Sequence, residues 1–384
     1  MARQLVIIFL ISELILLQSP TFGQAQWRSL FNGKDLQGWV RKGGSATYQV
    51  EKGEIVGRTV PNTPNTFLCT TEEFGDFIFE ADLQVDSGFN SGIQFRSQEK
   101  TEDSSHRVYG YQMEIDPSPR AWSGGIYDEG RREWLYIPQI NPAAKQAFRI
   151  GDWNHYRIEA IGPVLRTWVN GIPVSNLVDD LTPRGFIALQ VHAIYGEMKP
   201  GMQIHWKNLR IQTQQLVPSD PDDIAVVNLI DNTLSPQEMA QHFRLLFNGK
   251  DLSGWRVIHS AEPPGQRWQV VDETLQVSPS DGSETGNDIV TTDQYGAFEL
   301  IFDFRLTDGA NSGVKYFVDE AYDSQGKSGI GLAYQLLDDL RHPDAKMGAA
   351  GNRTLASLYD LIPSYPLEKR FQRKIGEWNQ GRIR

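Results

Sequence analysis

Residues 77–85 read FIFEADLQV, and their alternation decides the fold class. Phe77, Phe79, Ala81, Leu83 and Val85 occupy every second position, with mostly polar residues between them. Successive side chains of a strand point to opposite faces, so the stretch predicts a half-buried β-strand. Similar runs are separated by Gly, Pro, Asn and Asp: GIQFRS, YGYQMEID, HYRIEAIG, VLRTWVNG, GFIALQVHA and QIHWKNLRI. Long helical periodicity is absent, so we predict an all-β antiparallel sandwich.

Two copies of one domain make up most of the chain. LFNGKDLQGW at 30–39 recurs as LFNGKDLSGW at 246–255, and further motifs recur in the same order, such as YQMEID and YQLLDD. We therefore predict a domain over residues 26–213 and a second copy over residues 244–384. Between them, residues 214–243 are polar and predict a linker, in which Ser235, Pro236 and Glu238 predict the start of a short helix.

The second copy ends at a position that corresponds to about residue 159 of the first. The counterpart of residues 160–213 is absent from it, so we expect the second copy to be poorly stable when isolated. Its counterpart of Glu114 is Leu337, and the position equivalent to His192 lies beyond its end. A site of the first domain's type is therefore incomplete in the second copy.

Composition and the first residues limit the partners and the compartment. The 384 residues include 37 Lys and Arg against 48 Asp and Glu, a net charge of −11, so we expect no nucleic acid partner. Residues 1–25 combine Arg3, an apolar stretch and small residues near Gly23, a pattern typical of a signal peptide. We expect a periplasmic or secreted protein without membrane association after cleavage; a retained membrane anchor is the alternative. The oligomeric state is not predicted.

Seven ordered motifs resemble one bacterial family. LFNGKDLQGW, NSGIQFRS, YGYQMEID, SGGIYDEGRREWLY, DWNHYRIEAIG, RTWVNG and FIALQVH together resemble the 3-keto-disaccharide hydrolase domain, fully over residues 30–213 and partly over residues 246–384. The resemblance implies a jelly-roll sandwich like that of the concanavalin A-like lectins and glucanases. It also implies a small carbohydrate substrate that is oxidised at C3.

A row of polar side chains is the candidate site. If the apolar residues of three strands fill the core, alternation turns their polar neighbours to the other face. These neighbours are Gln94, Arg96, Gln112, Glu114, Asp116, Gln190 and His192. The resemblance implies that this face is concave and binds sugar. The alternative is that the row is only the solvated face of a sheet.

A ketone at C3 acidifies the C2 proton, so a base can remove it and the enolate can expel the C1 substituent. His192 is the candidate base, since imidazole titrates near neutral pH. Glu114 is the alternative base or the acid for the leaving group, and Arg96 is the candidate for stabilising the oxyanion. A divalent metal on His192, Glu114 and Asp116 is compatible with their chemistry, but no ligand motif requires one.

The loop RAWSGGIYDEGRREWLY is expected to border the site. Trp122 and Trp134 are candidates for stacking on sugar rings, and Asp128 and Arg131 for contacting hydroxyl groups. Two other functions remain open at this point. A carbohydrate-binding module would use the same face without catalysis. An ordinary glycoside hydrolase of the glucanase type would need a second glutamate where this chain has Pro119.

Overall fold

The structure is a computed structural model that describes residues 26–101, 106–196, 198–265, 267–278, 288–322, 328–366 and 370–384. It divides into two compact units, Met1–Phe243 and Arg244–Arg384. The predicted signal peptide, residues 1–25, lies outside the described residues. Within the described ranges, no helix has the length and apolar composition needed to cross a membrane.

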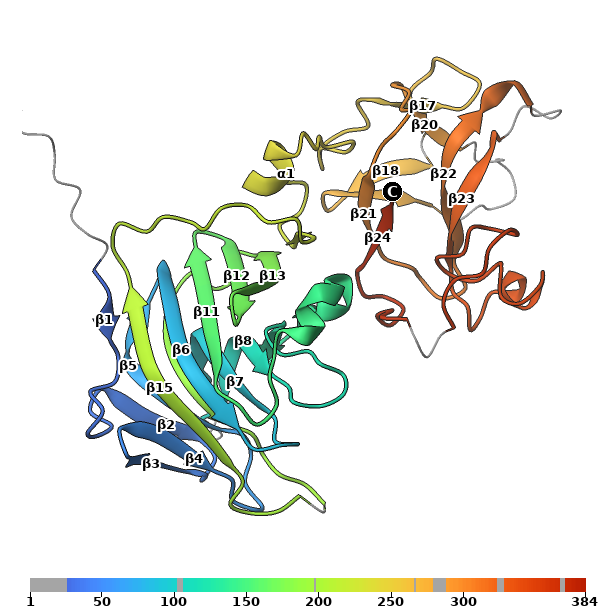
Figure 1. Cartoon of the computed structure of the whole chain (residues 1–384). Helices are drawn as coiled ribbons and strands as arrows, with labels where there is room; N and C mark the ends of the chain where they lie inside the picture. Colours follow the sequence, from blue (N-terminus) through green and yellow to red (C-terminus); the bar gives the residue numbers. More distant parts are fainter. Residues whose placement is uncertain are drawn as a thin grey trace, which may run out of the picture. The chain divides into compact units, whose positions relative to one another are not determined.

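The first unit is a jelly-roll sandwich of two mainly antiparallel sheets (Figure 1). The nine-stranded sheet has the order β16-β13-β12-β11-β6-β15-β4-β3, with β1 paired to β15. Its strands are β1 (Arg28–Ser29), β3 (Thr47–Glu51), β4 (Glu54–Arg58), β6 (Phe77–Val85), β11 (Asn154–Ile161), β12 (Val164–Val169), β13 (Ile172–Val178), β15 (Gln203–Gln212) and β16 (Val227–Asn228).

The seven-stranded sheet has the order β10-β9-β8-β7-β14-β5-β2. Its strands are β2 (Trp39–Gly43), β5 (Thr66–Phe74), β7 (Ser91–Glu99), β8 (Val108–Ile115), β9 (Ile126–Glu129), β10 (Glu133–Tyr136) and β14 (Gly185–Val191). Two 3-10 helices, η1 (Pro138–Ile140) and η2 (Pro142–Gln146), follow β10. Strand β14 lies between β5 and β7, so segments that are far apart in the sequence are neighbours in this sheet.

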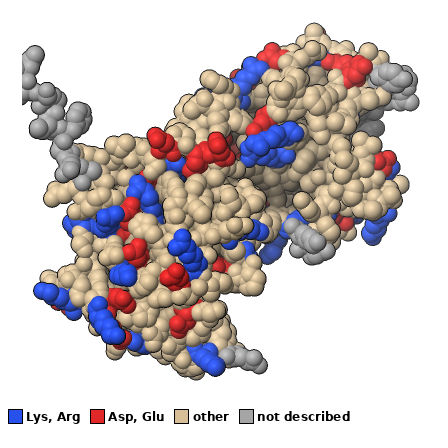
Figure 2. Space-filling model, in the orientation of Figure 1, with Lys and Arg blue, Asp and Glu red and all other residues tan. Residues whose placement is uncertain are grey.

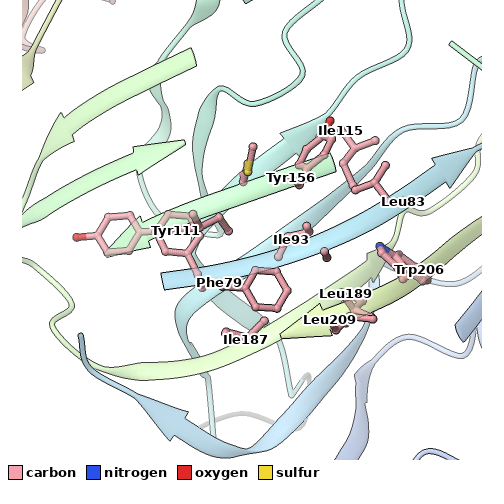
Figure 3. Packing of buried hydrophobic residues seen from close by; sticks show 14 of the residues in the cluster. Phe79, Leu83, Ile93, Tyr111, Ile115, Tyr156, Ile187, Leu189, Trp206 and Leu209 are labelled. Carbon is pink, nitrogen blue, oxygen red and sulfur yellow. The ribbon is translucent and has the colours of Figure 1, made fainter. Parts of the chain in front are cut away.

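The core fills the space between the two sheets. Figure 3 shows Phe79 and Leu83 of β6 and Trp206 of β15 packed against Ile93 of β7 and Leu189 of β14. The prediction for residues 77–85 is confirmed, because the five alternating apolar side chains of β6 are all buried. On the opposite face of β6, Glu80 is also buried, since Arg157 and Arg210 both form ion pairs with it.

Local turn signals form as the sequence predicts. Asn170 and Gly171 connect β12 to β13, and both have positive φ, 51° and 79°. Those two residue types tolerate this conformation, which matches the twist of a tight hairpin. The short helix α1 (Pro236–Ala240) begins with a capping box in which Ser235 and Glu238 each accept a hydrogen bond from the other's backbone N–H.

Residues between the two sequence copies pack onto the first unit. β16 pairs in parallel with β13, and Arg166 donates hydrogen bonds to the carbonyls of Ser219 and Asp220. Asn176 of β13 donates to Gln237 in α1. The stretch expected to be a linker thus adds an edge strand and a helix to the first unit, because the exposed edge of β13 offers unpaired backbone groups.

The second unit contains four two-stranded antiparallel sheets among its described residues: β17-β20, β18-β19, β21-β24 and β22-β23. The strands are β17 (Trp255–Val257), β18 (Trp268–Val271), β19 (Thr274–Val277), β20 (Ile289–Thr291), β21 (Leu300–Phe304), β22 (Asn311–Asp319), β23 (Ile330–Leu337) and β24 (Asn379–Ile383). Two 3-10 helices are η3 (Glu320–Tyr322) and η4 (Pro343–Lys346). A small cluster around Phe304, Leu336 and Leu355 forms its core.

Candidate active site

A row of amides and one carboxyl group lies on the outer face of the seven-stranded sheet. Its inner neighbours Ile93, Met113 and Leu189 belong to the core, so alternation places Gln94, Gln112, Glu114 and Gln190 on the other side. The row is not solvated: Gln94 is 0% exposed, Gln112 2% and Glu114 4%. Buried polar side chains on a sheet face need partners, which makes their hydrogen bonds informative.

Three of these side chains form a directional chain that ends on Glu114. Ser97 Oγ lies 2.6 Å from Gln94 Oε1, and Gln94 Nε2 donates to Gln112 Oε1 at 2.7 Å. Gln112 Nε2 then donates to Glu114 Oε2 at 3.0 Å, while Asn90 Nδ2 donates to Glu114 Oε1 at 2.6 Å. Gly92 makes room for this arrangement, because a Cβ at its position would lie 2.3 Å from the Gln112 amide carbon.

Glu114 is placed to exchange protons near neutral pH. Burial raises the pKa of its carboxyl group from 4.5 to about 7, and the charge of Asp116 adds to the rise. The hydrogen bonds from Asn90 and Gln112 and the Arg120 guanidinium, 3.8 Å away, act in the opposite direction. Desolvation is the largest of these effects, so the neutral acid remains populated where an exposed glutamate is ionised.

Gln190 differs from the other amides of the row. Its Nε2 and Oε1 are both buried, and neither has a hydrogen-bond partner among the described residues. Leu189 pairs with Ile93, so the next step of the same register places Gln190 beside Gly92, which pairs with Glu114. Two strand spacings, about 10 Å, therefore separate the backbones of Gln190 and Glu114, and the residue between them has no side chain.

His192 lies just beyond the end of β14 and is half-buried. Its Nδ1 is 2.7 Å from the carbonyl oxygen of Ala193. Because a carbonyl only accepts hydrogen bonds, this contact places the proton of the neutral ring on Nδ1 and leaves a lone pair on Nε2. Burial lowers the pKa of His192 below its ordinary 6.5, so the neutral ring is the main form at pH 7.

The structure does not bring Arg96 to the row. A bulge interrupts the pairing of β7 and β8 between Phe95 and Gln98, and Arg96 has a φ of +45°. The alternation used to orient this side chain therefore fails at the bulge. The guanidinium instead donates to the carbonyls of Gly75, Gly162 and Ala160 and to Asp76. It joins the β5–β6 connection to the end of β11 and the turn that follows it.

Asp128 and Arg131 also lie apart from the row. Asp128 pairs with Tyr111 of β8, whose ring belongs to the core, so its carboxylate points inward. Arg131 and Arg132 both bond to this carboxylate, and Arg131 also donates to Thr182. These contacts join the β9–β10 turn to the loop after β13.

Asp116 and the two candidate tryptophans lie at one end of the row. Asp116 accepts hydrogen bonds from Ser118 N and from Arg120 Nε, at 3.0 and 2.8 Å. The Arg120 guanidinium lies over the rings of Trp122 and Trp134, 4.3 and 5.1 Å from the centroids. The two indoles meet edge to face with centroids 4.6 Å apart. Trp134 is partly exposed and Trp122 is buried.

Two further residues lie at this face, and of these Asn90 was not identified from the sequence. Asn90 bonds directly to Glu114, and Glu129 of β9 lies opposite Gly110 on the outer face. Burial raises the pKa of Glu129, against the lowering effects of Arg107 and of a hydrogen bond with Asn65. The alternation in IYDE, 126–129, was the available signal, because it turns Glu129 outward when Ile126 faces the core.

The described residues do not gather the proposed metal ligands. Among them, no three His, Cys, Asp or Glu side chains lie close enough together to hold a metal ion. The single cysteine, Cys69, is buried beside Phe67 and Ala188, and burial raises the pKa of its thiol above the ordinary value. A hollow of about 330 Å³ lined by Arg28, Phe31 and Glu72 lies near the first strand and not at the row.

The charges visible on the surface are mixed. On the face shown in Figure 2, Lys and Arg side chains are interspersed with Asp and Glu side chains. Several of the positive charges on the nine-stranded sheet are paired, as with Arg157 and Arg210 on Glu80. Surface charge of one sign is the usual feature of a nucleic acid-binding face, and the displayed face lacks it.

Comparisons with known proteins identify the family. Residues 26–212 and 242–384 match the family described as the 3-keto-alpha-glucoside-1,2-lyase-like domain. These matches cover most of the chain, so it belongs to this family, with two copies of the domain. The resemblance inferred from the seven motifs is confirmed.

A curated relative supports the same assignment. A 3-keto-disaccharide hydrolase of Bacteroides thetaiotaomicron is 33% identical over 157 residues, which are 38% of this chain and 52% of the relative. The chain thus spans about half the length of the curated relative it matches.

Two solved structures with low identity are also similar. One is a Bacillus subtilis protein of unknown function with a galectin-like fold, with 10% identity and a TM-score of 0.38, over 49% of this chain and 94% of that one. The other is the carbohydrate-binding module CBM66 of Bacillus subtilis, with 17% identity and a TM-score of 0.34, over 46% and 95%.

Proposed function

We propose that the first unit cleaves glycosides oxidised at C3, by elimination between C1 and C2 and then addition of water. The family description names a 3-keto-glucoside lyase, which supports a ketone at C3 as the activating group. The observation that supports the proposal is the carboxyl group of Glu114, whose pKa burial raises to about 7 on the outer sheet face, together with a neutral imidazole just beyond β14. Neutral His192 offers a lone pair on Nε2, and Glu114 has a pKa of about 7.

In the first step, His192 Nε2 takes the C2 proton, and the C–H electrons form the enolate with the C3 oxygen. The enolate then forms the C1=C2 double bond as the C1–O bond breaks. Glu114 donates its proton to the departing oxygen. The leaving group departs as an alcohol and a conjugated enone remains, with His192 now protonated and Glu114 ionised.

In the second step, the roles reverse and both groups recover their starting states. Glu114 takes a proton from water as the water oxygen bonds to C1, and His192 returns a proton to C2. The sum is hydrolysis of the glycosidic bond without net change in the enzyme. Gln190 replaces Arg96 as the candidate donor to the C3 oxygen, because its buried amide lacks a partner and Arg96 bonds elsewhere.

The aromatic end of the row is the proposed place for the sugar or its leaving group. Trp134 and Tyr127 are partly exposed there, with ring centroids 5.2 Å apart. Flat apolar rings with polar edges suit the faces of a pyranose. Gln94 and Gln112 were candidates for the same contact, but their amides bond to each other and to Glu114.

We further propose export to the periplasm or the cell exterior, on the pattern of residues 1–25. Fractionation of the native host, with sequencing of the mature N-terminus, tests this. A mature protein that begins near residue 26 in an exported fraction is the expected result. Retention in the cytoplasm with the first residues intact contradicts it.

The experiment offers the full-length chain 3-keto-trehalose, 3-keto-lactose and both unoxidised parents. Release from the keto sugars alone is the expected result, slowed when C2 carries deuterium, because the C2–H bond breaks in the first step. His192→Ala and Glu114→Gln should each reduce turnover by roughly 10²- to 10⁴-fold. Release from the parents would favour ordinary hydrolysis, and binding without release would favour a carbohydrate-binding module.

A further inference from the structure

We propose that Ser97, Gln94 and Gln112 form a reversible hydrogen-bond chain whose direction switches when Glu114 gains or loses its proton. Gln94 and Gln112 are then positioning residues that act through Glu114 and do not contact the sugar. The inference uses the proposed function only to explain why Glu114 changes its protonation state during turnover. The switch itself is a property of the protein without substrate.

With Glu114 ionised, the chain has one consistent direction. Glu114 accepts from Gln112, Gln112 accepts from Gln94, and Gln94 accepts from Ser97. Each amide uses its oxygen toward Ser97 and its NH₂ group toward Glu114. The described contacts therefore suit the carboxylate, which can only accept.

With Glu114 protonated, the opposite direction is equally consistent. The carboxyl O–H donates to Gln112 Oε1, Gln112 donates to Gln94, and Gln94 donates to Ser97 Oγ. Ser97 then needs another acceptor, and the carbonyls of Phe95 and Tyr111 both lie 3.2 Å from its Oγ. Amide oxygen and nitrogen have nearly the same size, so two amide flips reverse the chain without moving its other atoms.

The burial of the hydrogen-bond chain favours this reversal when the proton is on Glu114 Oε2, the oxygen that accepts from Gln112. Ser97 and Gln94 are fully buried, and Gln112 is nearly so. If the hydrogen-bond chain kept its direction with the proton on Oε2, the buried N–H of Gln112 would face an O–H and both would lose an acceptor. Leaving such groups unpaired costs about 1–3 kcal/mol each, whereas reversal keeps every bond.

Other charged and titratable groups act on Glu114 but lie outside the chain. Asp116 is on the same strand, Arg120 lies in the following loop, and Tyr127 is on β9. Tyr156 of β11 reaches from the opposite sheet, with its hydroxyl 3.5 Å from the Glu114 carbonyl. Asp116 and Arg120 shift the midpoint of the titration. The described hydrogen bonds of the Gln94 and Gln112 amides go to Ser97, to each other and to Glu114, and to none of these four groups.

The second unit provides an internal control. Gln335 is the counterpart of Gln112, is also buried, and donates to Asn311 at 2.9 Å. Leu337 stands at the position of Glu114, so no carboxyl group ends this chain. The Gln335 amide should therefore keep one orientation at every pH.

The test is a titration of the full-length chain, ¹⁵N-labelled at glutamine side chains, followed by NMR without substrate from pH 5 to 9. Single variants, Gln94→Met, Gln112→Met and Gln335→Met, assign the three amides. In the unsubstituted chain, the Gln94 and Gln112 resonances should move with one common midpoint near 7, and Gln335 should not move. Glu114→Gln should abolish both movements.

Interrupting the hydrogen-bond chain by substitution gives the second measurement. In Gln112→Met, Gln94 should stop reporting the titration, although Glu114 still titrates in ¹³C-glutamate spectra. Gln94→Met should raise the pKa of Glu114 by about one unit, a tenfold change in its acid dissociation constant. Hydrogen bonds to the ionised carboxylate are stronger than those to the neutral acid, so the loss of Gln94 weakens the chain more when Glu114 is ionised. A Gln94 amide that does not respond while Glu114 titrates overturns the proposal. Since no sugar is present, this outcome is independent of whether the unit cleaves keto-glycosides.

Discussion

The two units share backbone devices and differ in the side chains placed on them. In the first, Asn32 bonds to Asp35 and the Trp39 indole donates to the Leu30 carbonyl at 2.9 Å. In the second, Trp255 makes the equivalent bond to Leu246 at 2.7 Å. The hydrogen bonds of the identical LFNGKDL turn therefore form in both units, because these bonds join residues close together in the sequence.

The bulge in the central strand is also common to both units. Arg96 in β7 has a φ of 45° and its counterpart Phe317 in β22 has a φ of 52°. Both strands shift register at this point. Arg96 is buried and bonds to carbonyls of the β5–β6 connection and of the end of β11 with its following turn, whereas Phe317 is 62% exposed. The backbone bulge is thus present in both copies. Whether the bulge stabilises its unit depends on the side chain at this position.

The strand pair that carries the polar row differs in register. Gly92 pairs with Glu114 in the first unit, but its counterpart Gly313 pairs with Gln335, the counterpart of Gln112. The difference is two residues, which keeps each side chain on its face. Residues on the face can therefore change partners between the copies without exchanging core and surface.

Replacing Glu114 by the residue of the second copy should have the largest effect. We expect Glu114→Leu to reduce kcat on a 3-keto-glycoside by roughly 10²- to 10⁴-fold, because the leaving group loses its acid. Gln335→Leu in the second unit is the matched control and should leave kcat unchanged. Thermal unfolding of both variants checks that the fold is intact, and full activity of Glu114→Leu would contradict the assignment.

The raised pKa of Glu114 should also appear in stability. A carboxyl group whose pKa is 4.5 when unfolded and about 7 when folded binds more protons in the folded state between these values. The free energy of unfolding therefore falls as the pH rises through this window, by about 3 kcal/mol at most. Glu114→Gln removes this contribution, so urea unfolding at pH 5 and pH 8 should show a smaller loss of stability in the variant. An equal loss in both proteins would contradict the raised pKa.

Arg96→Met tests whether the residue at the bulge stabilises the first unit. The change removes the donors to three carbonyls, those of Gly75, Ala160 and Gly162, and should lower the free energy of unfolding by about 3 kcal/mol. Phe317→Met, at the equivalent exposed position, should change it by less than about 0.5 kcal/mol. Turnover per folded molecule should survive in Arg96→Met. If turnover is lost while the unit remains folded, Arg96 has a role in the chemistry after all.

The sequence predicted the sandwich and its inner face because alternation is a local property. Phe79, Ile93 and Met113 are in the core as expected. Alternation gave the wrong face for Arg96, because a bulge adds a residue to the strand. A bulge can be recognised only from the pairing with the neighbouring strand. Asp128 was expected at the site because its segment was treated as a loop, but the segment contains β9, in which Asp128 pairs with the core residue Tyr111 and Glu129 faces outward.

The hydrogen-bond partners of the polar row could not be predicted from the sequence, for a different reason. Gln94, Gln112 and Gln190 share a face and a residue type, so alternation gives them one role. Their partners depend on cross-strand register and on the space above Gly92, both of which are tertiary. The structure therefore separates the two amides bonded in the chain from the one without a partner.

The aromatic end of the row should give the smallest effect. Asp116 and its counterpart Asp339 each pair with an arginine, but Arg120 lies on Trp122 and Trp134, whereas Arg370 bonds to Asp339 and to the Leu355 carbonyl. If the partly exposed Trp134 stacks on the sugar, Trp134→Leu should raise KM about threefold to tenfold, equivalent to about 1 kcal/mol, with kcat nearly unchanged. Steady-state kinetics on the keto sugar, with Trp378→Leu in the second unit as control, measures this. A fall in kcat at constant KM would instead mean that the indole positions Arg120 and Asp116 near Glu114, and the stacking role would be withdrawn.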